Sequence, residues 1–297
     1  MRRSLVCFIA LLIPCWVHAQ DFPKSIVSWE AKPEGPVFAG EGNTDWDKKI
    51  RERGWIAMDS GVYHLWYTGY NETLSPDRFL GHATSKDGLK WTRDQANPIH
   101  KTSWVEDVCV VKKDGIDYMF AEGRNDRAHM LISADGIHWE DRGTLEIRTT
   151  EGLPIPPGPF GTPTVIFEKG NWYLLYERGD RGVWVATSKD LKVWKNVSDE
   201  PVIKMGPDPY DKEAVAVDHV IKRDNVFYAF YHANSHKPWG QWTTCVARSK
   251  DLIHWEKYDK NPIIGETPNS SSVLVETPDG DRLYLMHPNL MIYRHPK

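Results

Sequence analysis

The stretch Ala83-Thr-Ser-Lys-Asp-Gly-Leu-Lys-Trp91 decides the fold, because it returns three more times along the chain. The other copies are Ile132-Ser-Ala-Asp-Gly-Ile-His-Trp139, Ala186-Thr-Ser-Lys-Asp-Leu-Lys-Val-Trp194 and Ala247-Arg-Ser-Lys-Asp-Leu-Ile-His-Trp255. The four tryptophans are 48, 55 and 61 residues apart, a period typical of propellers and other closed arrays. Each copy predicts a strand, a tight turn whose Ser and Asp side chains bond backbone N–H groups, and a second strand carrying the Trp.

A second hairpin precedes each copy, and a further one follows the last copy. Each is an apolar run, a polar turn and an aromatic-rich run, and the five hairpins cover residues 53–68, 107–122, 162–177, 218–232 and 271–287. Two hairpins form one four-stranded antiparallel blade, so the sequence predicts an all-β, five-bladed β-propeller. The last blade lacks an outer strand, and the echo Ile26-Val-Ser-Trp29 predicts that the N-terminal strand closes it and covers an exposed sheet edge.

The first 19 residues have the pattern of a signal peptide. Arg2 and Arg3 precede an apolar run from Ser4 to Val17, and Val17-His-Ala19 is a small-residue cleavage site. The apolar run is shorter than a transmembrane helix requires. We therefore expect a secreted or periplasmic protein in which residues 20–297 form one propeller domain.

Composition narrows the range of partners. The formal net charge is −4, and the expected cleavage would remove two of the basic residues. A mildly acidic chain without basic clusters argues against nucleic acid or a membrane surface as a partner, and we expect a monomer. Fourteen Trp and 12 Tyr suit the stacking of flat sugar rings, although aromatic residues are also good strand formers. In the mature chain Cys109 and Cys245 could form a disulfide or remain buried thiols.

Titratable residues gather at one end of the predicted hairpins. Residues equidistant from a hairpin turn lie opposite each other, so position 107 should face 122, 162 should face 177, and 218 should face 232. The first strand of each blade lines the propeller axis, so these ends should converge on one pocket. The convergent set is Arg53, Thr68, Glu106, Asp107, Glu122, Thr162, Glu177, Asp218, His219, His232, Ser271 and His287.

Charged groups at strand ends that face a core are costly to desolvate, so their clustering is the main functional signal in the sequence. Two other readings remain open. The residues could hold the ring together, for instance through Arg53 and Asp107. Asp218, His219 and His232 could also hold a cation, although the chain contains no compact metal motif and we expect no cofactor.

At these residues the chain resembles the five-bladed propeller enzymes that act on sugars. These are the arabinanase and β-xylosidase family (glycoside hydrolase family 43), the invertase-like family and the β-mannoside phosphorylase family. The phrases that carry the resemblance are Thr44-Asp-Trp-Asp47, Tyr63-His-Leu-Trp-Tyr-Thr-Gly69, Gly81-His-Ala-Thr-Ser-Lys-Asp-Gly-Leu-Lys-Trp91 and Val105-Glu-Asp107.

The resemblance implies an acidic residue at the start of the inner strand in several blades. Glu106-Asp107 is most similar to the Glu-Asp-Pro-Arg phrase of the phosphorylases, but Val108 and Cys109 stand where Pro and Arg would follow. Blade one has Arg53, and not an Asp, at the matching position, and blade three has Thr162-Pro163. The three-carboxylate arrangement of the arabinanase family is therefore not reproduced as a whole.

Glycosidic bond cleavage needs one carboxylic acid and one carboxylate, and an inverting enzyme holds the two roughly 6.5–9.5 Å apart. That separation suits acids on different blades. We assign Asp107 as general base, Glu177 as general acid, and Asp218 as the group that raises the pKa of the acid through like charge and serves as an orienter. Residues expected to bind a carbohydrate substrate are Arg53, Glu106, Glu122, His219 and His232.

The leading expectation is a secreted glycoside hydrolase acting on a poly- or oligosaccharide. Arg and His residues at the mouth, with Arg124 and Arg178 just beyond their strands, would also suit an acidic or sulfated sugar. Alternatives on the same fold are a lyase or dehydratase of uronic acids, a glycoside phosphorylase, and a sugar-binding propeller without catalytic activity.

Overall fold

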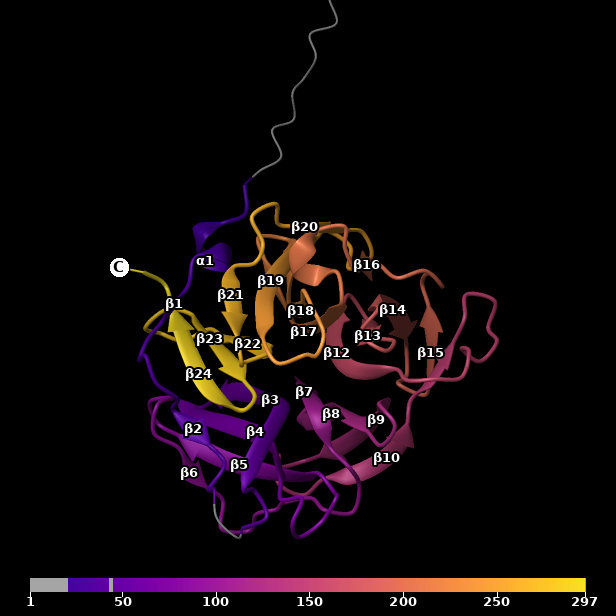
Figure 1. The fold of residues 1–297 in the computed structure, drawn as a ribbon. Coiled ribbons are helices and arrows are strands. Elements are labelled where there is room, and N and C mark those ends of the chain that lie inside the picture. The colour runs from indigo at the N-terminus through magenta and orange to yellow at the C-terminus, as the bar shows by residue number, and fades with distance from the viewer. Residues whose placement is uncertain (1–20, 43–44, 297) are drawn as a thin grey trace, which may run out of the picture.

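The computed structural model describes residues 21–42 and 45–296, and it confirms the five-bladed propeller. Five antiparallel sheets surround a central axis, and the first strand of each blade lies nearest that axis (Figure 1). The predicted signal peptide, residues 1–19, lies outside the described residues. Among the described residues, no helix is long and apolar enough to cross a membrane.

Four blades follow the chain from inner strand to outer strand. Blade I contains β3 (Lys49–Asp59), β4 (Val62–Tyr70), β5 (Phe79–Ser85) and β6 (Thr92–Arg93), and blade II contains β7 (Glu106–Lys113), β8 (Ile116–Gly123), β9 (Arg127–Ser133) and β10 (Glu140–Thr144). Blade III contains β12 (Gly161–Glu168), β13 (Asn171–Glu177), β14 (Gly182–Ser188) and β15 (Val193–Asn196), with β11 (Glu146–Arg148) and β16 (Ile203–Lys204) at its margins. Blade IV contains β17 (Ala214–Arg223), β18 (Val226–Asn234), β19 (Trp242–Ser249) and β20 (Trp255–Lys257), with β21 (Ile264–Thr267) beside β19, and a 3₁₀ turn at Pro209–Asp211 precedes the blade.

Blade V joins the two ends of the chain, as predicted. Strands β22 (Ser271–Val275), β23 (Arg282–Met286) and β24 (Asn289–Arg294) come from the C-terminal end, and β1 (Glu30–Ala31) pairs antiparallel with β24. The segment expected to be that strand is different, because α1 (Lys24–Val27) is a helical turn. Ile26 is fully buried in it, so its apolar side chain serves as a core residue beside the sheet. The strand begins after Trp29, and β2 (Phe38–Ala39) adds a second pairing with β24.

The repeated Ser-x-Asp turns have the predicted side-chain bonds. In blade I the Ser85 hydroxyl accepts N–H bonds from Asp87 and Gly88, and Asp87 accepts them from Leu89 and Lys90. The same pattern recurs at Ser133, Ser188 and Ser249. These N–H donors lower the pKa of the Asp in each turn. The motif therefore shapes the outer hairpin of blades I to IV.

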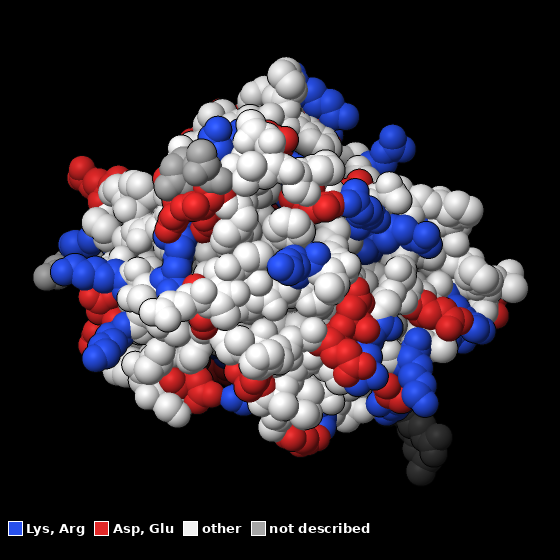
Figure 2. All heavy atoms as spheres, turned by 90° about the horizontal axis from the view of Figure 1, so that it is seen from below, with Lys and Arg blue, Asp and Glu red and all other residues white. Residues whose placement is uncertain are grey.

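The two cysteines of the described chain are free and buried. Cys109 lies in β7 and Cys245 in β19, and burial raises the pKa of both thiols. Of the two readings that the sequence left open, the structure supports buried thiols. On the outer face seen in Figure 2, acidic and basic side chains are interspersed, with apolar and uncharged groups between them.

The Ser-x-Asp turns supply a matched stability test. Gly88 and Gly136 occupy the left-handed position of their turns (φ 68° and 73°), whereas Leu191 and Leu252 adopt nearly the same φ of 65° and 67°. Leu→Gly at either position should relieve about 1–2 kcal/mol of backbone strain. Leu252 is 1% exposed, so Leu252→Gly should still lower the free energy of unfolding by about 2 kcal/mol, because an empty core site costs more than the strain.

Leu191→Gly is the control, because Leu191 only flanks the core. It should change the free energy of unfolding by no more than about 1 kcal/mol. Urea unfolding of both variants measures the difference. A gain of stability in both variants would show that relief of backbone strain, and not core packing, dominates at these turns.

Candidate active site

Bulges at the start of three inner strands direct side chains into the mouth of the ring. Glu52, Asp107 and Thr162 have φ of 49°, 46° and 43°, a left-handed conformation that is costly for residues other than glycine. Each lies where the ladder between the first two strands of its blade shifts register. A bulge of this kind bends the strand and re-aims a side chain. All three residues line one pocket.

The bulges also correct the expected pairing. The pairs are Glu106 with Glu122, Gly161 with Glu177 and Ala216 with His232, so the expected partners 107, 162 and 218 are displaced by one or two residues. Counting equal distances from the turn ignores the extra residues that a bulge inserts. In blade I the displacement matters most, because Glu52 takes the position that the sequence assigned to Arg53.

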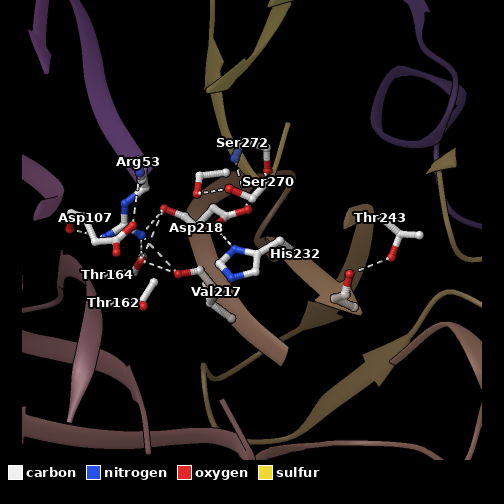
Figure 3. Close-up of polar contacts among 12 residues, drawn as sticks. Arg53, Asp107, Thr162, Thr164, Val217, Asp218, His232, Thr243, Ser270 and Ser272 are labelled. Atoms are coloured by element: carbon white, nitrogen blue, oxygen red, sulfur yellow. Dashed lines mark hydrogen bonds and ion pairs between the residues drawn. The ribbon is translucent and has the colours of Figure 1, made fainter. Parts of the chain in front are cut away.

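Arg53 is fully buried on the propeller axis, where its guanidinium binds backbone groups of three other blades (Figure 3). Its Nη2 donates to the carbonyls of Asp107 and Pro163, each at 2.6 Å, and its Nη1 donates to Asp218 O at 2.7 Å. Further bonds go to Val108 O, Val217 O and Thr164 Oγ1. With its donors occupied in this way, Arg53 has a position that fits the ring-holding alternative and does not fit the expected role in substrate binding.

The pocket above Arg53 has a cavity volume of about 220 Å³. Carboxyl groups dominate its wall, which is formed by Arg51, Glu52, Asp107, Glu122, Asp126, Thr162, Glu177, Gly179, Asp180, His232, Trp239 and Trp242. Of the residues expected from the sequence to converge on one pocket, five reach it: Asp107, Glu122, Thr162, Glu177 and His232.

Glu122 and Glu177 lie on either side of Gly161. Thr162 N–H donates to Glu122 Oε2 at 2.9 Å, and Gly161 N–H donates to Glu177 Oε1 at 3.0 Å. A Cβ on Gly161 would lie 2.0 Å from Glu122 Oε2 and 2.7 Å from Glu177 Oε1, so only glycine fits, and the two oxygens are within about 5 Å of each other. The pKa of Glu122 is raised well above its usual value by burial and by the charges of Asp107 and Glu177.

The other acids of the pocket are perturbed as well. Burial and the charge of Asp180 raise the pKa of Glu177 to about 7. Burial and the charge of Asp107 raise the pKa of Glu52 to about 8, even though Arg51 Nε lies 3.0 Å from its Oε1. Burial also raises the pKa of Asp107, against the opposing effects of the Arg53 charge and N–H. Several of these carboxyl groups therefore carry a proton near neutral pH.

Glu106 lies behind this wall and does not line the pocket. Its carboxylate binds Arg51 Nε at 2.8 Å, Arg78 Nε at 3.3 Å and Trp104 Nε1 at 2.7 Å. Glu106 thus fixes Arg51, which does line the pocket, and its expected contact with substrate is replaced by a supporting position.

Asp218 and His232 form a buried pair in blade IV. Asp218 is fully buried, and its Oδ1 accepts a hydrogen bond from His232 Nδ1 at 2.7 Å. Its Oδ2 accepts bonds from Ser272 N and Oγ of blade V, each at 3.0 Å (Figure 3). Burial alone would lower the pKa of His232, but the charge and hydrogen bond of Asp218 outweigh it and raise that pKa to about 9. Asp218 therefore orients a protonated imidazole, and Asp180 is the group that raises the pKa of Glu177.

His219 does not reach the pocket. Its ring packs edge-on against Trp55 at 4.8 Å between centroids, and its Nδ1 accepts the Leu274 N–H at 3.0 Å. Burial and the Arg53 charge lower its pKa to about 3, so the ring is neutral. Within residues 21–42 and 45–296, no group of three or more His, Cys, Asp or Glu side chains is arranged to hold a metal ion.

Sequence reasoning missed several residues of the pocket. Glu52 was hidden by the one-residue shift in blade I. Asp180 and Trp239 lie beyond the hairpin ends that were compared, in the connections that follow β13 and β18, and Trp242 is the first residue of β19. Trp239 is 40% exposed, an unusual state for a residue of this size, and it stacks obliquely with Trp242, which packs edge-on against His232. The signal that could have found it is Lys237-Pro-Trp-Gly240, a loop sequence with an aromatic residue where blade IV opens.

Comparisons with known proteins support a glycoside-processing enzyme fold. No family model matches the chain. A 1,2-β-oligomannan phosphorylase from Thermoanaerobacter sp. (strain X514) is 27% identical over 219 residues, which cover 67% of this chain and 69% of the phosphorylase.

Solved structures share the fold at lower identity. A glycosyl hydrolase from Bacteroides ovatus superposes with a TM-score of 0.73 at 16% identity, over 93% of this chain and 96% of that one. A protein solved in work on the GH130 family of mannoside phosphorylases, which contains glycoside hydrolases that target β-1,2 mannosidic linkages in Candida mannan, has a TM-score of 0.70 at 15% identity and covers 96% of both chains. The resemblance to five-bladed propeller enzymes of sugars is confirmed at the level of the fold.

Arg53 should be essential for stability. Arg53→Met would leave buried carbonyls of three blades without donors, so we expect a loss of about 3–5 kcal/mol in the free energy of unfolding, or failure to fold. The control is Arg142→Met, because the Arg142 side chain is 44% exposed and its ion pair with the exposed Glu140 should contribute about 1 kcal/mol or less. Chemical unfolding compares the two variants, and similar losses would contradict a special role for Arg53.

The raised pKa values of Glu52, Glu177 and His232 also predict how stability depends on pH. Each group binds its proton more tightly in the folded state than in the unfolded chain, so its contribution is complete below its unfolded pKa and is lost as pH rises through the folded value. With folded pKa values of about 8, 7 and 9, the free energy of unfolding should fall from about pH 5 to pH 9. Urea unfolding across this range tests the trend, and Glu177→Gln should flatten it. A free energy of unfolding that rises with pH over the same range would contradict the raised pKa values of these three groups.

Proposed function

We propose that this protein is an exported glycoside hydrolase that cleaves β-mannosidic linkages of an oligo- or polysaccharide. The observation that carries the proposal is the cluster of buried carboxyl groups around a single pocket, in which the pKa values of Glu122 and Glu177 are raised while the charges of Arg53 and His232 oppose the rise at Asp107. Glycoside hydrolysis needs a protonated and an ionised carboxyl group together, one to protonate the leaving oxygen and one to activate water or attack.

We assign Glu177 as the general acid and Asp107 as the general base. A pKa of about 7 leaves Glu177 able to donate a proton near neutral pH. The neighbouring carboxyl group of Glu122 can then supply Glu177 with a new proton. The charges of Arg53 and His232 favour the ionised form of Asp107. The two residues belong to neighbouring blades with Glu122 between them, which favours room for a water molecule and inversion at the anomeric carbon.

The charge of the pocket favours water over phosphate as the acceptor. Phosphorolysis needs a site for an anion, but Arg51 is already paired with Glu52 and Glu106, and His232 with Asp218. The remaining wall is acidic and would repel phosphate. The same repulsion disfavours a uronate in this pocket, so the lyase alternative receives no support from these residues.

The mannoside part of the proposal rests on the relatives. A chain 27% identical to this one acts on 1,2-β-oligomannan, and a similar fold belongs to hydrolases of β-1,2 mannosidic linkages. The exposed face of Trp239, beside Trp242, would stack against a sugar ring at the pocket wall.

The test is turnover of a panel of β-1,2- and β-1,4-linked manno-oligosaccharides, with and without phosphate. We expect free mannose at equal rates in both conditions, with the inverted anomer detected by NMR. Rates should decline as pH rises through about 7, because Glu177 loses its proton. Glu177→Gln and Asp107→Asn should each lower kcat roughly 10²–10⁴-fold.

Glu200→Gln, on an exposed loop, is the matched control and should leave the rates unchanged. Mannose 1-phosphate formed only with phosphate would replace hydrolysis with phosphorolysis. Saturable binding without turnover, unaffected by Glu177→Gln, would instead identify a binding propeller.

A further inference from the structure

Blade II carries a second cavity, larger than the active-site pocket. Its volume is about 390 Å³, within the range of roughly 300–1,000 Å³ that is usual for small-molecule sites. Its wall is formed by Ser103, Trp104, Gly123, Arg124, Asn125, Arg127, His129, Asp141, Gly143 and Thr144. We refer to it as the blade II cavity.

The turn between β8 and β9 separates this cavity from the active-site pocket. Asp126 faces the active-site pocket, whereas Asn125 and Arg127 on either side of it line the blade II cavity. The last two residues of β8 also face different cavities, because Glu122 lines the active-site pocket and Gly123 lines the blade II cavity. A ligand that emerges from the active-site pocket over this turn therefore enters the blade II cavity.

A buried histidine in the wall lacks one hydrogen-bond partner. His129 is 5% exposed, and its Nδ1 lies 3.4 Å from Asp141 Oδ1. Its Nε2 is enclosed and has no partner among the described residues. Gly123 makes room for this ring, since a Cβ there would lie 3.3 Å from His129 Cδ2. An unpaired buried nitrogen is costly, and because this Nε2 is enclosed, a sugar hydroxyl would pair with it only after the ring turns toward the cavity.

An aromatic side of the cavity is held rigidly. Trp104 lies between two guanidinium groups, Arg78 at 5.0 Å and Arg124 at 4.9 Å from its ring, and its Nε1 donates to Glu106. Arg124 is paired with Asp77, so the charge of this guanidinium is balanced within the protein. An aromatic wall next to Arg, Asn, Ser, Thr and Asp side chains offers apolar contact together with donors and acceptors for hydroxyl groups.

We propose that the blade II cavity binds a further, neutral sugar residue of the glycan whose scissile bond lies in the active-site pocket. The inference rests on the proposed function for the identity of the sugar. It predicts that the protein prefers chains longer than a disaccharide, because only these reach across the β8–β9 turn.

Thr144→Trp tests the proposal by filling the cavity. Thr144 is exposed on β10, opposite His129 in the ladder, so a larger side chain would enter the cavity without disturbing the core. The matched control is Thr92→Trp, at an exposed position on β6, the outer strand of blade I. KM and kcat are measured for β-1,2-mannobiose and β-1,2-mannotetraose, and the thermal midpoint confirms that each variant is folded.

We expect Thr144→Trp to raise KM for the tetrasaccharide about tenfold, which corresponds to the loss of one or two hydrogen bonds. The KM for the disaccharide should not change. Arg127→Ala should act in the same direction, and Thr92→Trp should have no effect. Equal kinetic constants for both substrates in the native protein, or equal effects of Thr144→Trp on both, would overturn the proposal.

A failure of the proposed function gives a different result. If no glycan is turned over, calorimetric titration with mannotetraose decides the matter. Binding that Thr144→Trp weakens and Thr92→Trp preserves would retain the sugar site without the hydrolase. If mannotetraose does not bind the native protein, or if Thr144→Trp does not change its affinity, the proposal of a sugar site in the blade II cavity is wrong.

Discussion

The structure depends on one buried guanidinium. Arg53 projects from blade I into the axis and donates to backbone carbonyls of blades II, III and IV, so four blades meet around one side chain. A buried cation is costly unless its donors are paired, and here backbone carbonyls supply the pairing. Asp218 then connects blade IV to Ser272 of blade V, and the Glu52 N–H donates to His287 Nδ1 at 3.2 Å to join blade V to blade I. The ring is therefore closed by polar contacts at its centre as well as by pairing at its edge.

This way of closing the ring determines the chemistry of the mouth. Carbonyls can face Arg53 only if the inner strands bulge at that level, and the same bulges send Glu52, Asp107 and Thr162 into the pocket above. The positive charge below favours ionisation of Asp107, while burial of the surrounding acids favours protonation. Arg53 and His232 thus oppose the rise in the pKa of Asp107 that its burial causes.

The sequence was sufficient for the fold because its strongest signals are local. The Ser-x-Asp turns satisfy their own backbone groups, and the hairpin patterns recur at a regular period, so blade number and chain closure follow from spacing. The strand that closes the ring was misplaced, since Ile26 looks the same in a strand as in a helical turn that buries it. Pocket residues in three blades were found, because Asp107, Glu122, Glu177 and His232 lie at or beside the hairpin ends.

The errors arise where a bulge adds residues that hydrophobic pattern does not record. Side chains on a strand alternate between faces, so one inserted residue exchanges a pocket residue for its neighbour, as with Glu52 and Arg53. The presence of a charged residue is then a poor guide to its role, because the sequence does not distinguish a buried Arg bonded to carbonyls from an exposed Arg that binds substrate. Asp218 illustrates the same point, since its two carboxylate oxygens are used up by His232 and Ser272 before any substrate could reach them. In a ring of this kind, a titratable residue on an inner strand belongs to the axis or to the pocket according to its place within the bulge, and only the three-dimensional ladder register distinguishes the two.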